Sequence, residues 1–444
     1  MVRLCSRVLA GLVALVLAGM ALPTGAVAGS AAGDGRRATY AKAKFDVRTN
    51  SYAFGQAPVF APDGTVWFGK DFGTGDKIDV YRANRDGSGL KCMTCELSSR
   101  SNNVPALRPQ GDWILFHSWM NHNIDVGSAG YGGIGSELYA MRPDGSHVTK
   151  IYGLHEPSDG EGTDDYHAYW SPDGRRIVWA HLDGNFITGH GNARWDVRVA
   201  TFVVRHGKPG LTHVRVVRPA NAHWYETQWW APNGKGFLYT ETHGTADNTE
   251  LFYCRLPKHG MCHSRRLTRN VGWDEQAIFT PDMKDVIFMS SRAHPGFYNT
   301  YSTVAADLGL TTELDNFLIL PVFELGFLQP IAPESTDLYE LDLKTHSVRR
   351  LTHDGDKGWI IPEFGWDPSG RQLWWTENRY PPGESVELPL DLLDQLKLTV
   401  QFLQHPDINT GAVTDFGTLP VKVQQRTRIA HFEGVKVPAD RSAK

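Results

Sequence analysis

A turn motif that occurs six times along the 444-residue chain constrains its fold more than any other feature. In each copy an aromatic residue or Leu stands two positions before a Pro, and a turn pair and a hydrophobic strand follow. Pro fixes φ at the first turn position, Asp, Asn or Ser bonds back to the backbone, and Gly takes the positive φ. Each copy therefore predicts a β-hairpin. The six copies are Phe60-Ala-Pro-Asp-Gly64, Leu107-Arg-Pro-Gln-Gly111, Trp170-Ser-Pro-Asp-Gly174, Trp230-Ala-Pro-Asn-Gly234, Phe279-Thr-Pro-Asp-Met283 and Trp366-Asp-Pro-Ser-Gly370.

Two further patterns recur after these hairpins. An acidic–aliphatic–aromatic triplet, which predicts a third strand, occurs at Asp79-Val-Tyr81, Glu137-Leu-Tyr139, Glu250-Leu-Phe252 and Asp337-Leu-Tyr339, and in a weaker version at Trp195-Asp-Val. A fourth strand then ends in Met93-Thr94, Leu267-Thr268 or Leu351-Thr352. Six units of four antiparallel strands predict an all-β protein, a six-bladed β-propeller, in preference to a β-sandwich. We expect residues 44–49 to supply the outer strand of the sixth blade and so close the ring.

The spacing of the six turns predicts large insertions. Successive turns are 47 to 87 residues apart, whereas a four-stranded blade needs about 40 to 45 residues. The longest interval contains an apolar segment, 294–332, and a segment with Leu residues at helical spacing, 380–410. We expect the two to form a small helical and apolar cap on a propeller domain of residues 44–444. A permanent cover is favoured over a moving lid, which is usually less apolar.

The N-terminus has the features of a signal peptide over residues 1–28. Arg3 and Arg7 precede an apolar run, which ends at the small-x-small sequence Ala26-Val27-Ala28. The run is too short for a comfortable membrane span, although a retained anchor is the alternative. We therefore expect cleavage near Ala28, a linker over 29–43, and a secreted mature chain, extracellular or in the cell envelope, with no membrane span.

The charge balance and the cysteines narrow the interpretation further. With 45 Lys and Arg against 49 Asp and Glu, the chain lacks the excess of positive charge that nucleic-acid binding needs. We expect the protein to be a monomer. In an oxidising compartment Cys254 and Cys262 are expected to form a disulfide across a short hairpin. Cys92 and Cys95 either pair with each other or bind a metal. A disulfide is favoured, because the second half of a zinc site is missing at suitable spacing.

The innermost strand of each blade begins near the central channel, so the polar residues before each turn motif should converge there. Carboxylates, amides and one imidazole suit a divalent cation or a cationic ligand, although a merely wet channel mouth is the alternative. His167 is the candidate catalytic residue, and His167, Gln228 and Glu275 are the candidate metal ligands. The candidate ligand-binding residues are Gln56, Asn103, Asp164, Asp165, His167, Glu226, Gln228, Asp274, Glu275, Gln276 and Glu363.

The combined pattern of aromatic-Ser-Pro-Asp-Gly, Asp/Glu-Leu-Tyr and Leu-Thr resembles that of TolB-type six-bladed β-propellers of secreted bacterial proteins. The resemblance covers nearly all of residues 45–444, and it extends to the propeller domain of dipeptidyl peptidase IV-like enzymes. The Gly-x-Ser-x-Gly elbow of those peptidases is not in this sequence, so the resemblance implies no peptidase activity. A resemblance to oligogalacturonate lyase-like propellers implies a channel metal held by His167, Gln228 and Gln276.

Two functions from different classes fit these observations. The first is a binding or scaffold module that holds a protein, a peptide or a cell-wall glycan at its channel mouth. The alternative is a metal-assisted polysaccharide lyase or hydrolase, in which a divalent cation in the channel activates an α-proton or a water and His167 moves the proton. The first is favoured, because no complete catalytic set is recognisable in the sequence.

Overall fold

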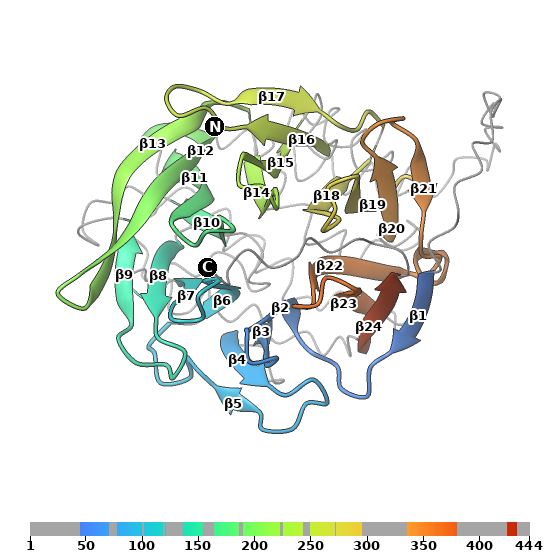
Figure 1. Ribbon diagram of the computed structural model, residues 1–444, viewed down its shortest axis with the longest axis horizontal. Coiled ribbons are helices and arrows are strands. Elements are labelled where there is room, and N and C mark those ends of the chain that lie inside the picture. Colours follow the sequence, from blue (N-terminus) through green and yellow to red (C-terminus); the bar gives the residue numbers. More distant parts are fainter. Residues whose placement is uncertain are drawn as a thin grey trace, which may run out of the picture.

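The computed structural model describes residues 45–70, 78–99, 102–118, 120, 136–153, 164–185, 190–222, 225–242, 249–270, 272–294, 335–379 and 424–432. Within these ranges the chain forms six four-stranded antiparallel sheets that stand around a common axis (Figure 1). The predicted all-β, six-bladed propeller is therefore confirmed. The expected signal peptide, the linker, the 380–410 insertion and nearly all of the 294–332 insertion lie outside the described residues.

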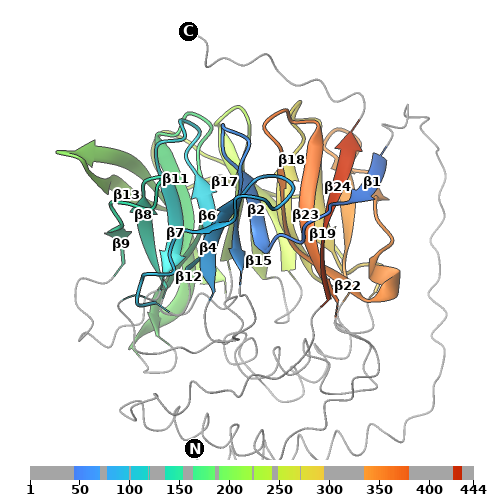
Figure 2. The ribbon, with the colours of Figure 1, turned by 90° about the horizontal axis from the view of Figure 1, so that it is seen from below.

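The blades are numbered in chain order, and their strands are seen side by side in Figure 2. Blade 1 contains β2 (Gln56–Phe60), β3 (Val66–Lys70), β4 (Asp79–Ala83) and β5 (Lys91–Cys92). Blade 2 contains β6 (Asn102–Leu107), β7 (Ile114–Ser118), β8 (Glu137–Met141) and β9 (Thr149–Tyr152). Blade 3 contains β10 (Asp164–Trp170), β11 (Arg176–Asn185), β12 (His190–Arg205) and β13 (Lys208–Ala222).

The second half of the ring has the same construction. Blade 4 contains β14 (Tyr225–Trp230), β15 (Gly236–Thr242), β16 (Thr249–Arg255) and β17 (His263–Arg266). Blade 5 contains β18 (Asp274–Phe279), β19 (Asp285–Ser290), β20 (Asp337–Asp342) and β21 (Val348–Arg350). Blade 6 contains β22 (Trp359–Trp366), β23 (Gln372–Arg379), β24 (Gln424–Phe432) and β1 (Phe45–Thr49), and a 3-10 turn, η2 (Gly355–Lys357), precedes it.

Blade 6 closes the ring by joining strands from the two ends of the chain. Its order is β22-β23-β24-β1, and β1 pairs antiparallel with β24, from Phe45 opposite Phe432 to Thr49 opposite Arg428. The blue β1 and the red β24 lie next to each other in Figure 1. The expected closure is confirmed. It replaces what would otherwise be an open blade edge with a hydrogen-bonded pair of strands.

The hairpin turns have the geometry that their residues dictate. In the first turn the N–H of Gly64 donates to the carbonyl of Ala61 at 2.9 Å, and Gly64 has a φ of 85°. The fifth turn places Met283 at the same position with a φ of 60°, although Met has a Cβ that disfavours this conformation. The turn is therefore specified strongly enough by its other residues to hold a non-glycine residue in the left-handed region.

The Trp of the turn motif joins neighbouring blades. The indole N–H of Trp170 donates to the Ala106 carbonyl of blade 2 at 3.0 Å, and that of Trp230 donates to the Tyr169 carbonyl of blade 3 at 3.0 Å. In blade 6 the indole of Trp366 bonds a carbonyl of blade 5 in the same way. Each of these rings also packs against apolar side chains between blades. The motif thus specifies both a turn and a blade-to-blade contact.

The acidic residue of the third strand and the Thr after the fourth strand form one unit. In blade 4 the hydroxyl of Thr268 donates to Glu250 at 2.7 Å and accepts the Leu251 N–H at 2.9 Å. Blades 1 and 5 repeat both bonds, with Thr94 on Asp79 and Thr352 on Asp337. Because these carboxylates are buried, the bonds compensate for the water that they lose.

The cysteines follow the expectation in one case and not in the other. Cys92 and Cys95 form a disulfide. Cys254 and Cys262 are free thiols, so the expected bond between them is wrong. Cys254 lies directly opposite Ser264 in the β16–β17 pair, which leaves Cys262 on the diagonal. Diagonal positions of an antiparallel pair lie farther apart than directly opposite ones, so this register does not favour a disulfide.

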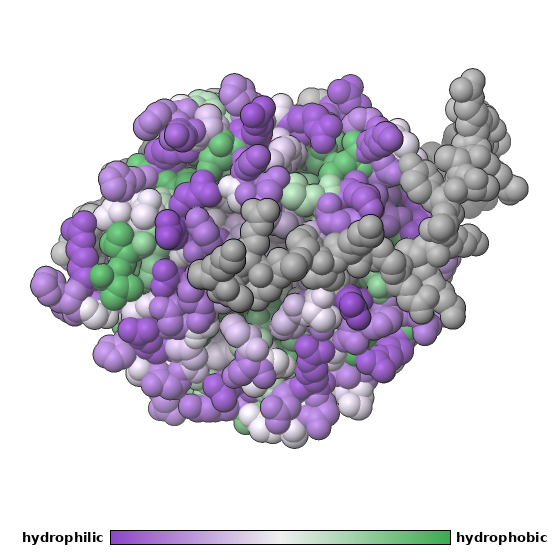
Figure 3. Space-filling view, viewed as in Figure 1, coloured by the Kyte–Doolittle hydropathy of each residue, from purple (hydrophilic) through white to green (hydrophobic). Residues whose placement is uncertain are grey.

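The face of the molecule shown in Figure 3 is mainly hydrophilic, and its apolar residues gather in small separate groups. In the described part of the chain, no helix has the length and apolar character needed to cross a membrane.

Candidate functional site

Five polar side chains from four consecutive blades meet near the propeller axis. They come from the innermost strands β10, β14, β18 and β22, and each belongs to a buried residue. The five residues, called the axial cluster below, are His167, Glu226, Gln228, Gln276 and Glu363. Residues that are up to 196 positions apart in the sequence therefore contribute to one site.

Glu226 is the centre of this cluster. Its Oε1 atom lies 2.9 Å from Nδ1 of His167 and accepts hydrogen bonds from the side-chain amides of Gln228 at 2.7 Å and Gln276 at 2.9 Å. On the other side of the imidazole, Nε2 of His167 lies 3.6 Å from Glu363. The imidazole therefore stands between two carboxylates.

The backbone at this level is irregular in every inner strand. The pairing of the first and second strands shifts register at this point in all six blades. Four residues there have a positive φ although they are not glycine: Ala57, Val104, His167 and Gln276. All four stand five positions before the Pro of the turn motif. Such bulges re-aim side chains, and strained non-glycine residues of this kind gather at functional sites.

Burial and charge act in opposite directions on the ionisable groups of the cluster. Burial lowers the pKa of His167, but the Glu226 and Glu363 carboxylates outweigh it, so the pKa lies above 6.5. Burial raises the pKa of Glu363 to about 7; nearby Glu226 adds to this and His167 opposes it. Burial also raises the pKa of Tyr169 well above 10, with help from Glu363, Glu226 and Glu275. The two carboxylates thus favour the charged form of His167, whereas burial favours the neutral forms of Glu363 and Tyr169.

One member of the site was missed from the sequence. The ring of His117 stacks on that of His167, with 6.4 Å between ring centroids, although His117 belongs to the second strand of blade 2. Burial, together with the charge on His167, lowers the pKa of His117 to about 3, so this ring is neutral. A signal was present, because His117 pairs directly with Asn103, which was a candidate. The end of a second strand always lies beside the start of the first strand in an antiparallel hairpin.

Trp229 closes the axis on the turn side of the cluster. This residue packs against three core clusters, which lie between blades 1 and 2, between blades 3 and 4, and between blades 5 and 6. A side chain can reach all three only from the axis. Trp229 follows Gln228 along β14 toward the hairpin turn, so the indole lies between the axial cluster and the turn face of the ring.

The other predicted residues lie in different settings. Asp165 accepts bonds from Trp179 at 2.8 Å and His181 at 2.7 Å within blade 3. Asp274 accepts bonds from Ser290 and Arg292 within blade 5, and from Asn270 in the segment that follows blade 4. Asp165 therefore holds blade 3 together, and Asp274 does the same for blade 5 while also tying it to that segment. The side chain of Asn103 caps the N–H of Val104 at 2.8 Å, that of Glu275 lies close enough to Tyr169 to affect its pKa, and those of Gln56 and Asp164 lie outside the described structure.

Groups of metal-ligand type occur elsewhere in the described chain. In two places three such side chains bring one ligand atom each within 4.8 Å of one another: Asp79 with Cys92 and Cys95, and His294 with Asp337 and Asp356. In the first group both sulfurs belong to the disulfide.

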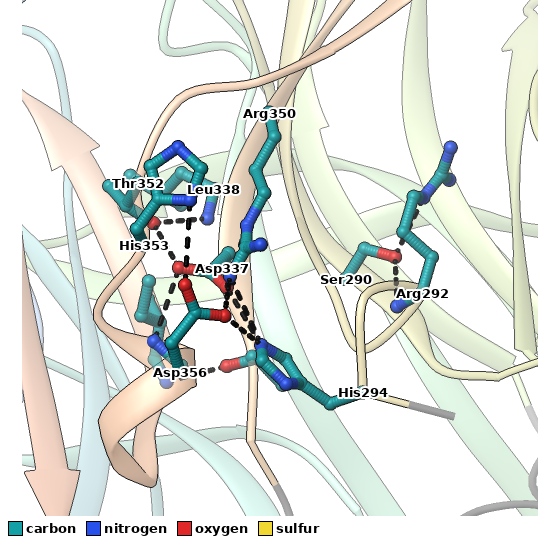
Figure 4. Close-up of polar contacts among 12 residues, drawn as sticks. Ser290, Arg292, His294, Asp337, Leu338, Arg350, Thr352, His353 and Asp356 are labelled. Atoms are coloured by element: carbon teal, nitrogen blue, oxygen red, sulfur yellow. Dashed lines mark hydrogen bonds and ion pairs between the residues drawn. The ribbon is translucent and has the colours of Figure 1, made fainter. Parts of the chain in front are cut away.

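The second group already contains a cation. Arg350 bonds Asp337 and Asp356, each at 2.6 Å, and lies 3.3 Å from His294, as Figure 4 shows. Its guanidinium takes the place that a metal ion would need between the two carboxylates. This group therefore serves to tie blade 5 to the η2 turn.

Comparisons with known proteins bear on the fold only. No model of a known family matches the sequence, and neither does any curated protein. Among solved structures, a putative TolB from Agrobacterium tumefaciens is 15% identical, with a TM-score of 0.40 over 65% of this chain and 73% of that chain. TolB from Acinetobacter baumannii is 14% identical, with a TM-score of 0.42 over 71% of this chain and 60% of that chain. An oligogalacturonate lyase in complex with manganese is 11% identical, with a TM-score of 0.42 over 88% of this chain and 96% of that chain.

Proposed function

We propose that this protein is an exported binding module that holds a ligand at the axial cluster of its propeller. The ligand is a protein, a peptide or a cell-wall glycan that places a polar group at the channel mouth. One observation carries the proposal: five buried polar side chains from four blades converge on Glu226 and His167 at the axis. Buried polar groups are costly for folding, so a site of this kind is retained more readily when it binds something.

The direction of approach follows from Trp229. Because the indole lies between the cluster and the turn face, the ligand enters from the opposite face, where the inner strands begin. The second strands end on that same face, and His117 on β7 reaches the cluster from there. The inner strands and the second strands thus both contribute to the entrance of the proposed site.

The alternative proposal is a metal-assisted polysaccharide lyase or hydrolase with its metal at His167, Gln228 and Glu275. Such a metal would polarise the substrate or a water, and a neighbouring group would move the proton. To be bound by His167, the metal ion would need a lone pair on one of the imidazole nitrogens. Both ring nitrogens of His167 face carboxylates, which favours the protonated ring and disfavours ligation. The geometry therefore supports binding better than metal-assisted chemistry.

The proposal can be tested by a ligand screen on the full chain. Thermal stability would be measured with defined panels of short peptides and of plant and bacterial oligosaccharides, and each hit would be titrated by calorimetry. We expect His167→Ala and Gln228→Ala to weaken a true ligand at least about tenfold, because each removes a polar contact from the centre of the site.

A matched substitution away from the axis serves as the control. Glu340→Gln changes a carboxylate on β20 that pairs with Arg349 at the rim, and it should leave the affinity unchanged. Ligands whose affinity is unaffected by both axial substitutions would overturn the proposal. Turnover of a polysaccharide that requires an added divalent ion and His167 would support the enzymatic alternative instead.

A further inference from the structure

Several buried carboxylates of the propeller are each held by a strong cation. On the third strands these are Glu137 with Lys150 at 3.0 Å, Glu250 with Arg266 at 2.6 Å and Asp337 with Arg350 at 2.6 Å. The carboxylate of Glu377 likewise pairs with Arg426 and Arg428. These pairs offset the general cost of burying an ion.

Glu363 does not follow this pattern. Its side chain is 11% exposed, and its one ion-pair partner in the described part of the chain is Nε2 of His167, at the long distance of 3.6 Å. The same imidazole also lies beside Glu226, at the shorter distance of 2.9 Å. Among the described residues, the one basic side chain paired with Glu363 is thus shared with a second carboxylate.

The same site contains a second hydrogen-bond acceptor. Gln228 is fully buried and its amide nitrogen donates to Glu226, while its Oε1 atom has no hydrogen-bond partner among the residues that the structure describes. Buried side-chain acceptors are normally bonded, so an open one at a candidate site points to a donor that arrives with the ligand. Glu363 and Gln228 are both acceptors. The missing partner therefore carries N–H groups and a positive charge.

We propose that the axial cluster recognises an organic cation, namely an alkylammonium or guanidinium group of the ligand, which donates to Glu363 with Oε1 of Gln228 as a further acceptor. This inference rests on the proposed function and specifies its ligand chemistry. A charge-assisted hydrogen bond to a buried carboxylate is among the stronger polar contacts available to a binding site. Both ring nitrogens of His167 already face carboxylates, which makes a metal ion the poorer occupant.

The test uses three probes that differ at the end of one side chain. These are the Nα-acetyl N-methylamides of lysine, arginine and norleucine, titrated into the full chain by calorimetry at pH 7. We expect the lysine or arginine probe to bind at least about tenfold more tightly than the neutral norleucine probe. The preferred cation identifies whether the natural group is an ammonium or a guanidinium.

Variants then assign the effect to the site. Glu363→Gln should remove the preference for the cation, whereas the rim variant Glu340→Gln should leave that preference unchanged. Should Glu363→Gln fold poorly, the difference in affinity between the cationic and neutral probes for the unaltered protein remains as the test. Any one of three results would overturn the inference. These are equal affinity for the norleucine and lysine probes, no binding of any probe at millimolar concentration, and displacement of the cationic probe by Mn²⁺ alone. Ligands that depend on His167 and Gln228 without preferring a cation would overturn it while leaving the proposed function intact.

Discussion

The pairing of Thr268 with Glu250 allows a quantitative test of how the repeat stabilises each blade. Thr268→Val keeps the shape of the side chain and removes its hydroxyl. It deletes a 2.7 Å hydrogen bond to a buried carboxylate, worth about 1.5–3 kcal/mol, and leaves the Leu251 N–H without its 2.9 Å acceptor, at a cost of about 1–3 kcal/mol. The additional methyl group of Val recovers part of this lost free energy by burying apolar surface. We expect the free energy of unfolding to fall by about 3 kcal/mol.

Urea unfolding followed by tryptophan fluorescence would measure this loss. The matched control is Thr65→Val, because the hydroxyl of Thr65 also bonds a carboxylate, that of Asp63 at 2.7 Å, but in an exposed turn. That change should cost about 0.5 kcal/mol or less. If Thr268→Val cost less than about 1 kcal/mol, or no more than Thr65→Val, the interpretation of the Leu-Thr motif as a buried hydrogen-bonding unit would be refuted.

Three further predictions follow from individual contacts. Nuclear magnetic resonance should show His167 titrating above pH 6.5. Because its pKa is raised in the folded state, the pairing of His167 with Glu226 stabilises the fold below pH 6.5, and this contribution is lost as the pH rises through the folded pKa. Glu226→Gln should therefore lower the free energy of unfolding more at pH 6 than at pH 9. Trp229→Ala should lower the free energy of unfolding by about 3 kcal/mol, and a loss under about 1 kcal/mol would contradict its place at the axis. A hydrogen bond from Cys254 lowers the pKa of Cys262 to about 7. Cys262 should therefore react with iodoacetamide at neutral pH before the buried Cys254 does. Peptide mass spectrometry would measure the order of labelling, and the reverse order would contradict this prediction.

Much of the candidate site could be named from the sequence, but not its internal arrangement. All five members of the axial cluster were among the eleven residues expected near the channel. Asp165 and Asp274 were in the same set, yet their side chains bond within their own blades. The difference arises at the bulge, where one extra residue changes which side chains face the axis. A sequence pattern predicts how far along a strand a residue lies, whereas the direction of its side chain depends on the local backbone.

The cysteines illustrate the same division. The spacing of Cys92 and Cys95 places both sulfurs in one short turn, so local geometry was enough to predict their bond. Cys254 and Cys262 are separated by a hairpin whose register sets Cys254 against Ser264. That register is decided by the pairing of two whole strands.

The amino-acid sequence by itself determined the local chemistry of this protein: six proline turns, the tryptophans that bond the next blade, the acidic residue with its threonine, and the strand that closes the ring. These follow from short-range preferences for particular backbone angles and from hydrogen bonds that each repeat makes in the same way. Only the tertiary structure decided that one imidazole would stand between carboxylates from two other blades, with Trp229 across the axis. Charge and burial at that point depend on side chains brought from distant parts of the chain, and they exist only once the ring has closed.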